Sequence, residues 1–282
     1  QIEALNAQTG PVLLAYKANT ELQAIIDGVA KGAPLYDVTA DTGVVHTLWK
    51  VDDAGSIDRM TKIVDAMDAL YIADGHHRSA AASRVAAKRR EEIALRRGKA
   101  HDTDSHEYFL AVAFPHDQMR IFDYNRVIRD LNGLTPEVFM AQIAQRFDIT
   151  PANAPVKPDK ATRFGMYLDG KWYQLDIQAK YIPKDDPVAQ LDVSLLQDNL
   201  IAPVLGISDP RRDKRIDFVG GIRGLGELEK RVTSGEMRVA FALHPTTLEQ
   251  LMAVADADQV MPPKSTWFEP KLADGLVSHV ID

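Results

Sequence analysis

The sequence predicts an α/β fold that becomes mixed α+β toward its C-terminal end, and two observations carry this prediction. Apolar runs of strand length alternate with segments of helical periodicity through the first hundred residues. Beyond them, strand-like runs and a hairpin signal follow one another with fewer helices between them. A polar link at 101–105 marks the expected boundary between regions 1–104 and 105–282, and a single domain is the alternative.

In the first region, each expected element has a local signal. The apolar residues of the segment 20–30 fall on one helical face, with Thr20 as its cap. Asp52 and Asp53 are typical of a turn and a helix cap. The expected elements are strands at 11–16, 35–39, 44–51 and 70–73, and helices at 20–30, 57–67 and 79–97.

In the second region, the clearest signal is Asp169-Gly170 between two apolar runs, which predicts a hairpin with a type I′ turn. Thr135 opens a helix, and the segment 148–160, rich in Pro and Ala, is typical of a loop. The expected elements are a strand pair at 108–114 and 119–124, a helix at 136–147, hairpin strands at 164–168 and 171–177, a helix at 193–204, a strand at 216–219 and a helix at 226–232.

Composition narrows the class of protein. The 282-residue chain has no cysteine, which excludes disulfides and thiolate metal sites, and its net charge of −7 disfavours broad nucleic-acid binding. No apolar run approaches membrane-spanning length. We therefore expect a cytoplasmic protein with neither a membrane nor a nucleic acid as partner, and with its oligomeric state open. Because the chain begins with Gln1 and has no signal-peptide features, we expect a fragment of a longer protein.

Residues 70–78 hold the densest polar chemistry of the sequence. An apolar strand runs through a glycine into a helix, so free backbone N–H groups and the positive end of the helix dipole meet at one point. Phosphate binds readily at such a point. A carboxylate there suggests a metal ion or a hydroxyl to be deprotonated, whereas the alternative is a structural turn. The candidate residues are Asp74, Gly75, His76, His77, Arg78 and Ser79, with Asp74 also the candidate metal ligand.

Two later stretches have a similar character. Residues 218–224 leave a strand through Gly220 and Gly221 and carry Arg223 at the junction, which suits either anion binding or a tight turn. The segment 261–271 is stiffened by prolines and presents Lys264, Ser265 and Thr266, either to a ligand or as a rigid surface crossover. It lacks the glycines of a Walker-type phosphate loop. These six residues complete the predicted set of nucleotide-binding residues.

The motifs resemble those of a known family. ADGHHR at 73–78, DKRIDFVGG at 213–221 and MPPKSTWFEPK at 261–271 are similar to the DUF1015 family of uncharacterised bacterial and archaeal proteins. The resemblance covers essentially the whole chain. Members of that family are longer at the N-terminus, where a Lys-His-Glu stretch lies just upstream of the segment matching Gln1. The resemblance thus implies an N-terminally incomplete member, and if that stretch supplies a catalytic carboxylate, no residue of this chain can be named for it.

The ADGHHR segment also resembles the nucleotide motif of the ParB/sulfiredoxin-like superfamily, and within it the Asp-Gly-His-His-Arg motif of free-serine kinases. This resemblance implies a ParB-like core with a mixed sheet, which binds ATP or ADP with Mg²⁺. Asp74 would then be the catalytic or metal-binding carboxylate, and residues 75–78 the phosphate cradle, with His76 and His77 also as catalytic residues. The missing cysteine excludes sulfinic acid repair, and the acidic charge opposes a ParB role in DNA partition.

Phosphoryl transfer requires neutralisation of charge on the migrating group and a base that positions the acceptor hydroxyl. The predicted function is accordingly a nucleotide-dependent small-molecule kinase that phosphorylates a hydroxyl group, with free serine as a candidate acceptor. Two alternatives remain open: a regulatory module that binds a nucleotide without turnover, and a nucleotide or phosphoester hydrolase.

Overall fold

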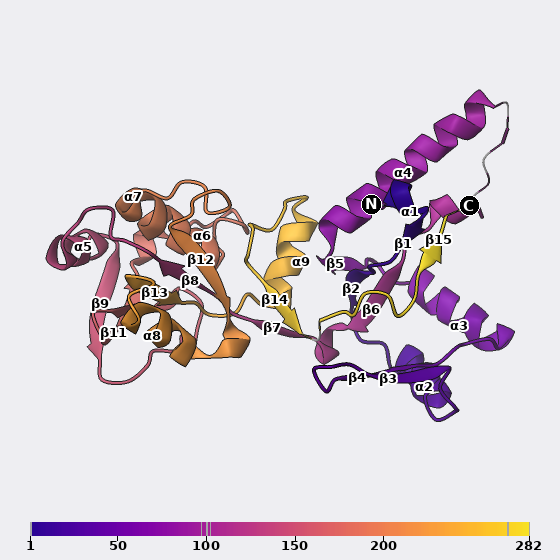
Figure 1. The fold of residues 1–282 in the computed structure, drawn as a ribbon, viewed down its shortest axis with the longest axis horizontal. Coiled ribbons are helices and arrows are strands. Elements are labelled where there is room, and N and C mark those ends of the chain that lie inside the picture. Colours follow the sequence, from indigo (N-terminus) through magenta and orange to yellow (C-terminus); the bar gives the residue numbers. More distant parts are fainter. Residues whose placement is uncertain (1, 97, 100, 102, 270, 282) are drawn as a thin grey trace. The chain divides into compact units, whose positions relative to one another are not determined.

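The computed structural model describes residues 2–96, 98–99, 101, 103–269 and 271–281, and it divides the chain into two compact units (Figure 1). Unit 1 comprises Gln1–Met119 and Lys271–Asp282, and unit 2 comprises Arg120–Pro270. The division falls after residue 119 instead of after residue 104. The reason is that β6 (Ala111–Pro115) pairs in parallel with β2 (Val12–Tyr16) and so completes the sheet of unit 1.

The sheet of unit 1 has the strand order β5 (Tyr71–Asp74), β2, β6. Strand β2 is antiparallel to β5 and parallel to β6, so the expected mixed sheet is confirmed. All five residues of β2 are buried because the strand lies between two neighbours and is apolar throughout. The polar residues at the end of β5 therefore come directly after a strand that pairs with β2, the middle strand of this sheet.

Two helices of unit 1, α2 and α3, begin at side-chain caps. Helix α2 (Thr20–Val29) is capped by Asn19, whose Oδ1 accepts a hydrogen bond from Leu22 N (2.9 Å), so the prediction of Thr20 as the cap was wrong. Asp53 caps α3 (Ala54–Asp65), as predicted. The remaining elements are α1 (Ile2–Leu5), β1 (Ala7–Gln8), β3 (Tyr36–Thr39), β4 (Val45–Leu48), α4 (His76–Leu95), two 3₁₀ turns (Ser105–Glu107 and His116–Gln118) and β15 (His279–Val280).

Unit 2 is built on a six-stranded antiparallel sheet. Its strand order is β12 (Ile216–Gly220), β8 (Tyr124–Ile128), β13 (Val239–Ala242), β10 (Arg163–Leu168), β11 (Lys171–Ile177) and β9 (Phe147–Ala152). The hairpin of β10 and β11 confirms the predicted type I′ turn, since Asp169 (φ 50°) and Gly170 (φ 76°) are both left-handed.

Helices cover both faces of this sheet. One core cluster joins Phe139 of α5 (Pro136–Ile143) to Leu196 of α6 (Asp192–Leu196) and Leu205 of α7 (Ala202–Leu205). The second cluster contains Leu228 and Val232 of α8 (Leu225–Thr233). The other elements of unit 2 are a π-helical turn (Gln197–Ile201), two 3₁₀ turns (Ala179–Tyr181 and Gly221–Arg223), α9 (Leu248–Asp256), β7 (Arg120–Phe122) and β14 (Trp267–Glu269).

Two further expectations about the strands are corrected. The segments 108–114 and 119–124 do not pair with each other, because β6 pairs with β2 whereas β7 pairs with β14. The segment 148–160 is not a loop throughout, since β9 pairs with β11 from Phe147 to Ala152. The helix expected to reach residue 147 ends at Ile143 for the same reason. Long-range pairing overrides local composition in each case.

Among the described residues, no helix combines the length and the apolar character that a membrane crossing requires.

Candidate functional site

The polar motif of unit 1 lies where β5 passes into α4, the 20-residue helix His76–Leu95. Gly75 makes this junction possible because its backbone is left-handed (φ 93°), a conformation that side chains other than Gly rarely adopt. A Cβ at this position would also lie 3.0 Å from Arg78 Nε and 3.3 Å from the Cα of Val12. The glycine therefore brings the strand end, the helix start and Arg78 close together.

The start of α4 has no side-chain cap, unlike those of α2 and α3. Gly75 occupies the N-cap position, and its carbonyl accepts from Arg78 N (2.8 Å) and Ser79 N (3.0 Å). The first backbone N–H groups of a helix have no acceptor within the helix. Asp74 Oδ1 accepts from Gly75 N (2.8 Å) and leaves the N–H groups of His76 and His77 to solvent or a ligand. The helix start thus offers donors and a positive dipole end to an anion.

Arg78 is held loosely between two carboxylates of unit 1. Its Nη2 lies 3.8 Å from Asp74 Oδ2, its Nη1 lies 3.8 Å from Asp274 Oδ1, and its side chain is 38% exposed. Both distances exceed those of a hydrogen bond, and solvent screens ion pairs at this exposure. The guanidinium can therefore exchange either carboxylate for another anion at little cost.

A cavity of about 120 Å³ opens beside Arg78. Gly10 keeps it open, because a Cβ there would lie 2.9 Å from Asp274 Oδ1 and 3.3 Å from Arg78 Nη1. Ligand pockets for whole small molecules occupy roughly 300–1,000 Å³, so this cavity has room for a group of phosphate size only. Its lining residues are Ile2, Ala7, Gln8, Thr9, Gly10, Arg78 and Asp274.

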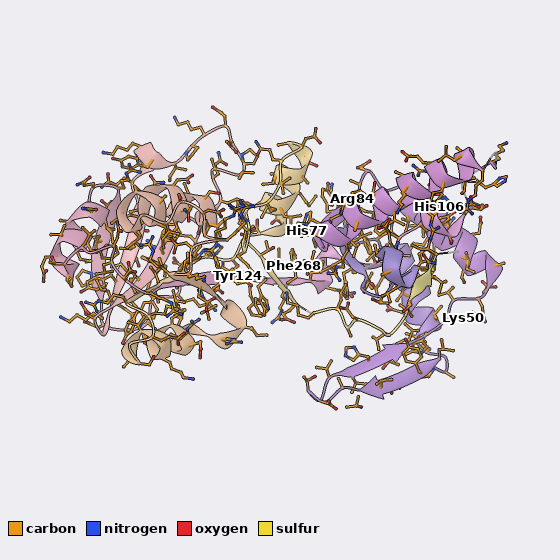
Figure 2. The ribbon with its side chains drawn as sticks, turned by 45° about the horizontal axis from the view of Figure 1, so that its top comes forward. Lys50, His77, Arg84, His106, Tyr124 and Phe268 are labelled. Atoms are coloured by element: carbon orange, nitrogen blue, oxygen red, sulfur yellow. The ribbon has the colours of Figure 1, made fainter. Side chains whose placement is uncertain are left out.

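The other motif side chains lie at the surface of unit 1. Asp74, His76 and His77 are exposed (His77 is labelled in Figure 2), and Ser79 is half-buried with its Oγ donating to the His76 carbonyl (3.2 Å). Within the described part of the chain, no three His, Asp or Glu side chains gather as a metal-binding group. Mg²⁺ commonly takes one or two protein carboxylates and completes its shell with phosphate and water. Asp74 is compatible with that kind of binding.

The predicted residues of the two later stretches all lie in unit 2. Strand β12 ends at Gly220, which packs against the Trp267 ring. A Cβ at Gly220 would lie only 2.5 Å from that ring. The carboxylate of Asp123 occupies the corresponding place beside Gly221. The space that a phosphate would need at these glycines is filled, and Asp123 would repel an anion there. Packing therefore explains the two glycines, and Arg223 beyond them is exposed.

The segment Met261–Trp267 lies against the same end of the sheet of unit 2. Ser265 is buried, its Oγ donates to the Pro262 carbonyl (2.6 Å), and its own carbonyl accepts from Thr246 Oγ1 (3.0 Å). Thr266 is half-buried, and Lys264 is exposed with a left-handed backbone (φ 57°). The structure thus brings the two later motifs together within unit 2, and Ser265 serves to hold the segment.

Two residues near the motifs were not predicted from the sequence. Asp274 lies far along the chain from Arg78, and nothing in its surroundings marks it. Arg126 has a usable signal, because it is a charged residue directly before the apolar pair Val127 and Ile128 of strand β8. Such a residue on a central strand is either paired or functional.

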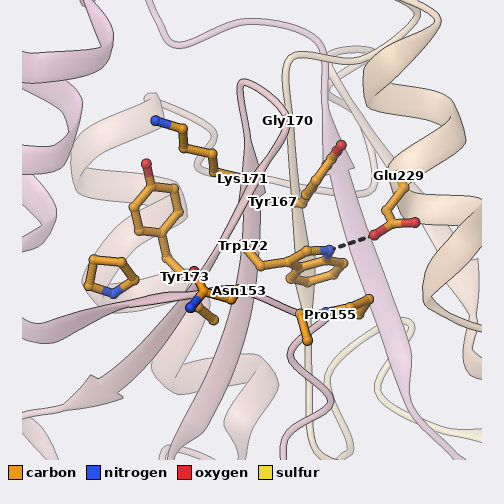
Figure 3. A pocket seen from close by; sticks show the side chains of 11 residues that line it. Asn153, Pro155, Tyr167, Gly170, Lys171, Trp172, Tyr173 and Glu229 are labelled. Atoms are coloured by element: carbon orange, nitrogen blue, oxygen red, sulfur yellow. Dashed lines mark hydrogen bonds between the residues drawn. The ribbon is translucent and has the colours of Figure 1, made fainter.

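A second cavity, of about 630 Å³, lies in unit 2 and contains none of the predicted residues (Figure 3). Trp172 and Tyr167 lie side by side in it, and the indole Nε1 donates to Glu229 Oε1 (2.7 Å). Lys171 and Tyr173 point to the other side of β11, as strand alternation requires. The polar groups in this cavity do not converge on one point, so it suggests no chemistry.

Fold and site together define a mixed α/β protein with an uncapped, arginine-flanked helix start. The chain belongs to the DUF1015 family, whose family model, described as a protein of unknown function, matches residues 1–194. No curated protein matches the chain.

Several solved structures resemble it at low identity. Free serine kinase in complex with AMP matches at 12% identity and a TM-score of 0.34, over 93% of this chain and 85% of the kinase chain. A conserved hypothetical protein from Pyrococcus furiosus matches at 13% identity and a TM-score of 0.39, over 97% and 82%. SbnI with a C-terminal truncation, from Staphylococcus aureus, matches at 10% identity and a TM-score of 0.41, over 98% and 75%.

Proposed function

We propose that the protein is a nucleotide-dependent small-molecule kinase that transfers a phosphoryl group to a hydroxyl. The observation that carries this proposal is the uncapped start of α4, where backbone donors and Asp74 lie next to Arg78, and Arg78 in turn lines a cavity of phosphate size. Phosphoryl transfer depends mostly on positioning and charge neutralisation, and these groups supply both. Free serine is one candidate acceptor, suggested by the resemblance of the motif to that of free-serine kinases.

Each residue of the motif has a role in this proposal. The N–H groups of the first turn of α4 and the guanidinium of Arg78 bind phosphate oxygens, and Gly75 lets them approach. Asp74 binds Mg²⁺ together with the phosphates, or accepts the proton of the acceptor hydroxyl. His76 and His77 are exposed on the first turn of α4, and in this proposal they contact the nucleotide or the acceptor.

The size of the cavity adds a constraint. A space of about 120 Å³ accommodates one phosphate group, so the ribose and base of ATP or ADP would lie outside it. Most of the binding free energy would then come from the phosphates. We expect affinity to depend strongly on salt and only weakly on the identity of the base.

The test is calorimetric titration with ATP and ADP in the presence of Mg²⁺, comparing wild type with Arg78→Ala. Arg84→Ala is the matched control, since Arg84 lies on the same helix, is exposed and carries the same charge (Figure 2). We expect Arg78→Ala to weaken binding roughly tenfold or more, as the loss of a charged hydrogen-bond donor does, and Arg84→Ala to bind like wild type. Equal binding by all three proteins would refute the phosphate cradle.

A second measurement separates the kinase from its alternatives. Incubation with radiolabelled ATP and a panel of free amino acids and sugars should yield a labelled acceptor, and Asp74→Asn should abolish it. Release of inorganic phosphate without an acceptor would indicate a hydrolase. Binding without any turnover would indicate a regulatory nucleotide-binding module.

A further inference from the structure

Arg126 is a buried cation in unit 2. It lies on the central strand β8 and is 5% exposed. One terminal nitrogen, Nη1, donates to the Tyr124 carbonyl, and Nη2 donates to the Lys264 carbonyl (3.0 Å). The guanidinium also stacks on Phe218, with Cζ 5.1 Å from the ring centroid. All of these partners are neutral.

No carboxylate among the described residues pairs with Arg126. Strand alternation places Tyr124, Arg126 and Ile128 on one face of β8, whereas Asn125 faces the other side and bonds the carboxylate of Asp123 there. Burial lowers the pKa of Arg126 to about 9, opposed only by Tyr124. Since arginine stays charged at neutral pH, a positive charge is buried here without a counter-ion, which is unfavourable unless an anion compensates it.

Lys264 places a second cation beside the first. Its ammonium lies 5.7 Å from the centroid of the Tyr124 ring, and it forms no ion pair with any described residue. Its side chain is exposed and therefore open to a ligand. Two prolines precede Lys264, and the Arg126 guanidinium binds its carbonyl, so the left-handed backbone at this residue (φ 57°) is held in place.

The aromatic rings around these cations form a continuous frame. Tyr124 contacts Phe218 edge to face at 6.0 Å and Trp267 at 5.3 Å, so the rings under Arg126 and Lys264 touch each other. Figure 2 shows Tyr124 and Phe268, which belong to the strands that hold this frame. Two cations thus lie on adjacent rings, in a chain whose net charge is −7. Repulsion between them favours the arrival of a divalent anion.

We propose that the surface around Lys264 is a phosphate-binding site of unit 2, in which Lys264 contacts the phosphate group and Arg126 is the positioning residue beneath it. Arg126 acts in two ways. Its hydrogen bond fixes the Lys264 backbone, and its uncompensated charge attracts the anion through a poorly solvated interior. All residues of this proposed site lie in unit 2, so the proposal does not require the kinase proposal to hold.

The test uses the full chain with Arg78→Ala, so that the cradle proposed in unit 1 does not contribute. Inorganic pyrophosphate and phosphate are titrated and followed by the indole N–H NMR signal of Trp267, assigned by Trp267→Phe among three tryptophans. Because Trp267 contacts Tyr124, its signal should move on binding. Added Lys264→Gln should weaken binding roughly tenfold or more, and Lys214→Gln, an exposed lysine of unit 2, should have no effect.

The role of Arg126 is tested with two variants. Arg126→Lys keeps the charge but loses the fork of donors, and Arg126→Gln loses the charge. We expect Arg126→Lys to retain more affinity than Arg126→Gln, and the dependence of affinity on salt to fall only for Arg126→Gln. If either variant fails to fold, the exposed Lys264→Gln still decides the question. Unchanged affinity in Lys264→Gln, or no movement of the Trp267 signal with either anion, would overturn the proposal.

Discussion

The chain contains two junctions with the same local pattern, a strand that leaves through glycine toward an arginine and a helix. In unit 1, Gly75 is left-handed, and the 20-residue helix after it starts without a side-chain cap. In unit 2, the Trp267 ring and the Asp123 carboxylate fill the space beside Gly220 and Gly221. One pattern therefore serves ligand approach in one unit and close packing in the other. The two junctions differ in the side chains that the fold places beside the glycines: Arg78 in unit 1, and Trp267 and Asp123 in unit 2.

The largest expected effect separates the glycines of the two junctions. Gly221→Ala should lower the free energy of unfolding by about 3 kcal/mol, because its Cβ would overlap the Asp123 carboxylate in a packed region. Gly75→Ala should lower the free energy of unfolding by only about 1–2 kcal/mol, mostly from strain at its left-handed backbone. The flexible Arg78 side chain can move aside, and the 3.3 Å approach to the Val12 Cα needs only a small shift. Urea unfolding followed by circular dichroism measures both values. Equal losses at the two positions would contradict the comparison.

A second effect concerns a buried acid of unit 2. Burial raises the pKa of Asp192 to about 7, against the opposing backbone N–H groups of Thr162 and His244. The folded protein thus keeps this proton to a higher pH than the unfolded chain, whose aspartates ionise near pH ~4. Its contribution to the free energy of unfolding falls as the pH rises from ~4 to ~7, by an amount on the order of 3 kcal/mol.

Asp192→Asn should remove that dependence, since the carboxamide oxygen can still accept from Thr162 N (2.8 Å in the wild type). Urea unfolding of wild type and variant at several pH values between 4 and 7 gives the difference. We expect the variant to gain relative stability as the pH rises. A constant difference across this range would show that Asp192 ionises in the folded protein as it does in the unfolded chain.

The sequence predicted the elements whose signals are local. Asp169-Gly170 specifies its turn by backbone preference alone, and Thr135 caps α5 as expected. Strand β9 was missed because its composition is that of a loop and only pairing with β11 makes it a strand. The same limit applies to the partners of β6 and β7, which lie far away in sequence.

The candidate site divides in the same way. The motif 73–78 could be located because strand, glycine and helix are contiguous in the chain, and the structure places them at one point. The carboxylate of Asp274 could not be predicted, since only folding brings it to Arg78. Nor could the sequence show that Gly75 and Gly220 have different roles, because the Trp267 ring that fills the space beside Gly220 comes from a distant strand.

A third and smaller effect compares the capped and uncapped helix starts of unit 1. Asn19→Ala should lower the free energy of unfolding by about 1 kcal/mol, because Leu22 N loses its hydrogen-bond acceptor. The variant should bind ATP as the wild type does, since α2 is capped and offers no site. Urea unfolding and calorimetry on the same preparation provide the two values. Weakened binding without loss of stability would mean that α2 belongs to the site.

The smallest effect tests whether Arg78 binds a ligand or stabilises the fold through its ion pair with Asp274. Asp274 Oδ1 lies 3.8 Å from Arg78 Nη1 and competes with any anion for it. Asp274→Asn removes the competing charge and should raise phosphate affinity about threefold, since exposed ion pairs of this kind are weak. Stability should hardly change. If instead the variant binds ATP less tightly, Asp274 belongs to the binding machinery, either by orienting the guanidinium or by joining Asp74 as a ligand of Mg²⁺. A calorimetric titration with and without Mg²⁺ separates those two roles, because only the second vanishes when the metal ion is left out.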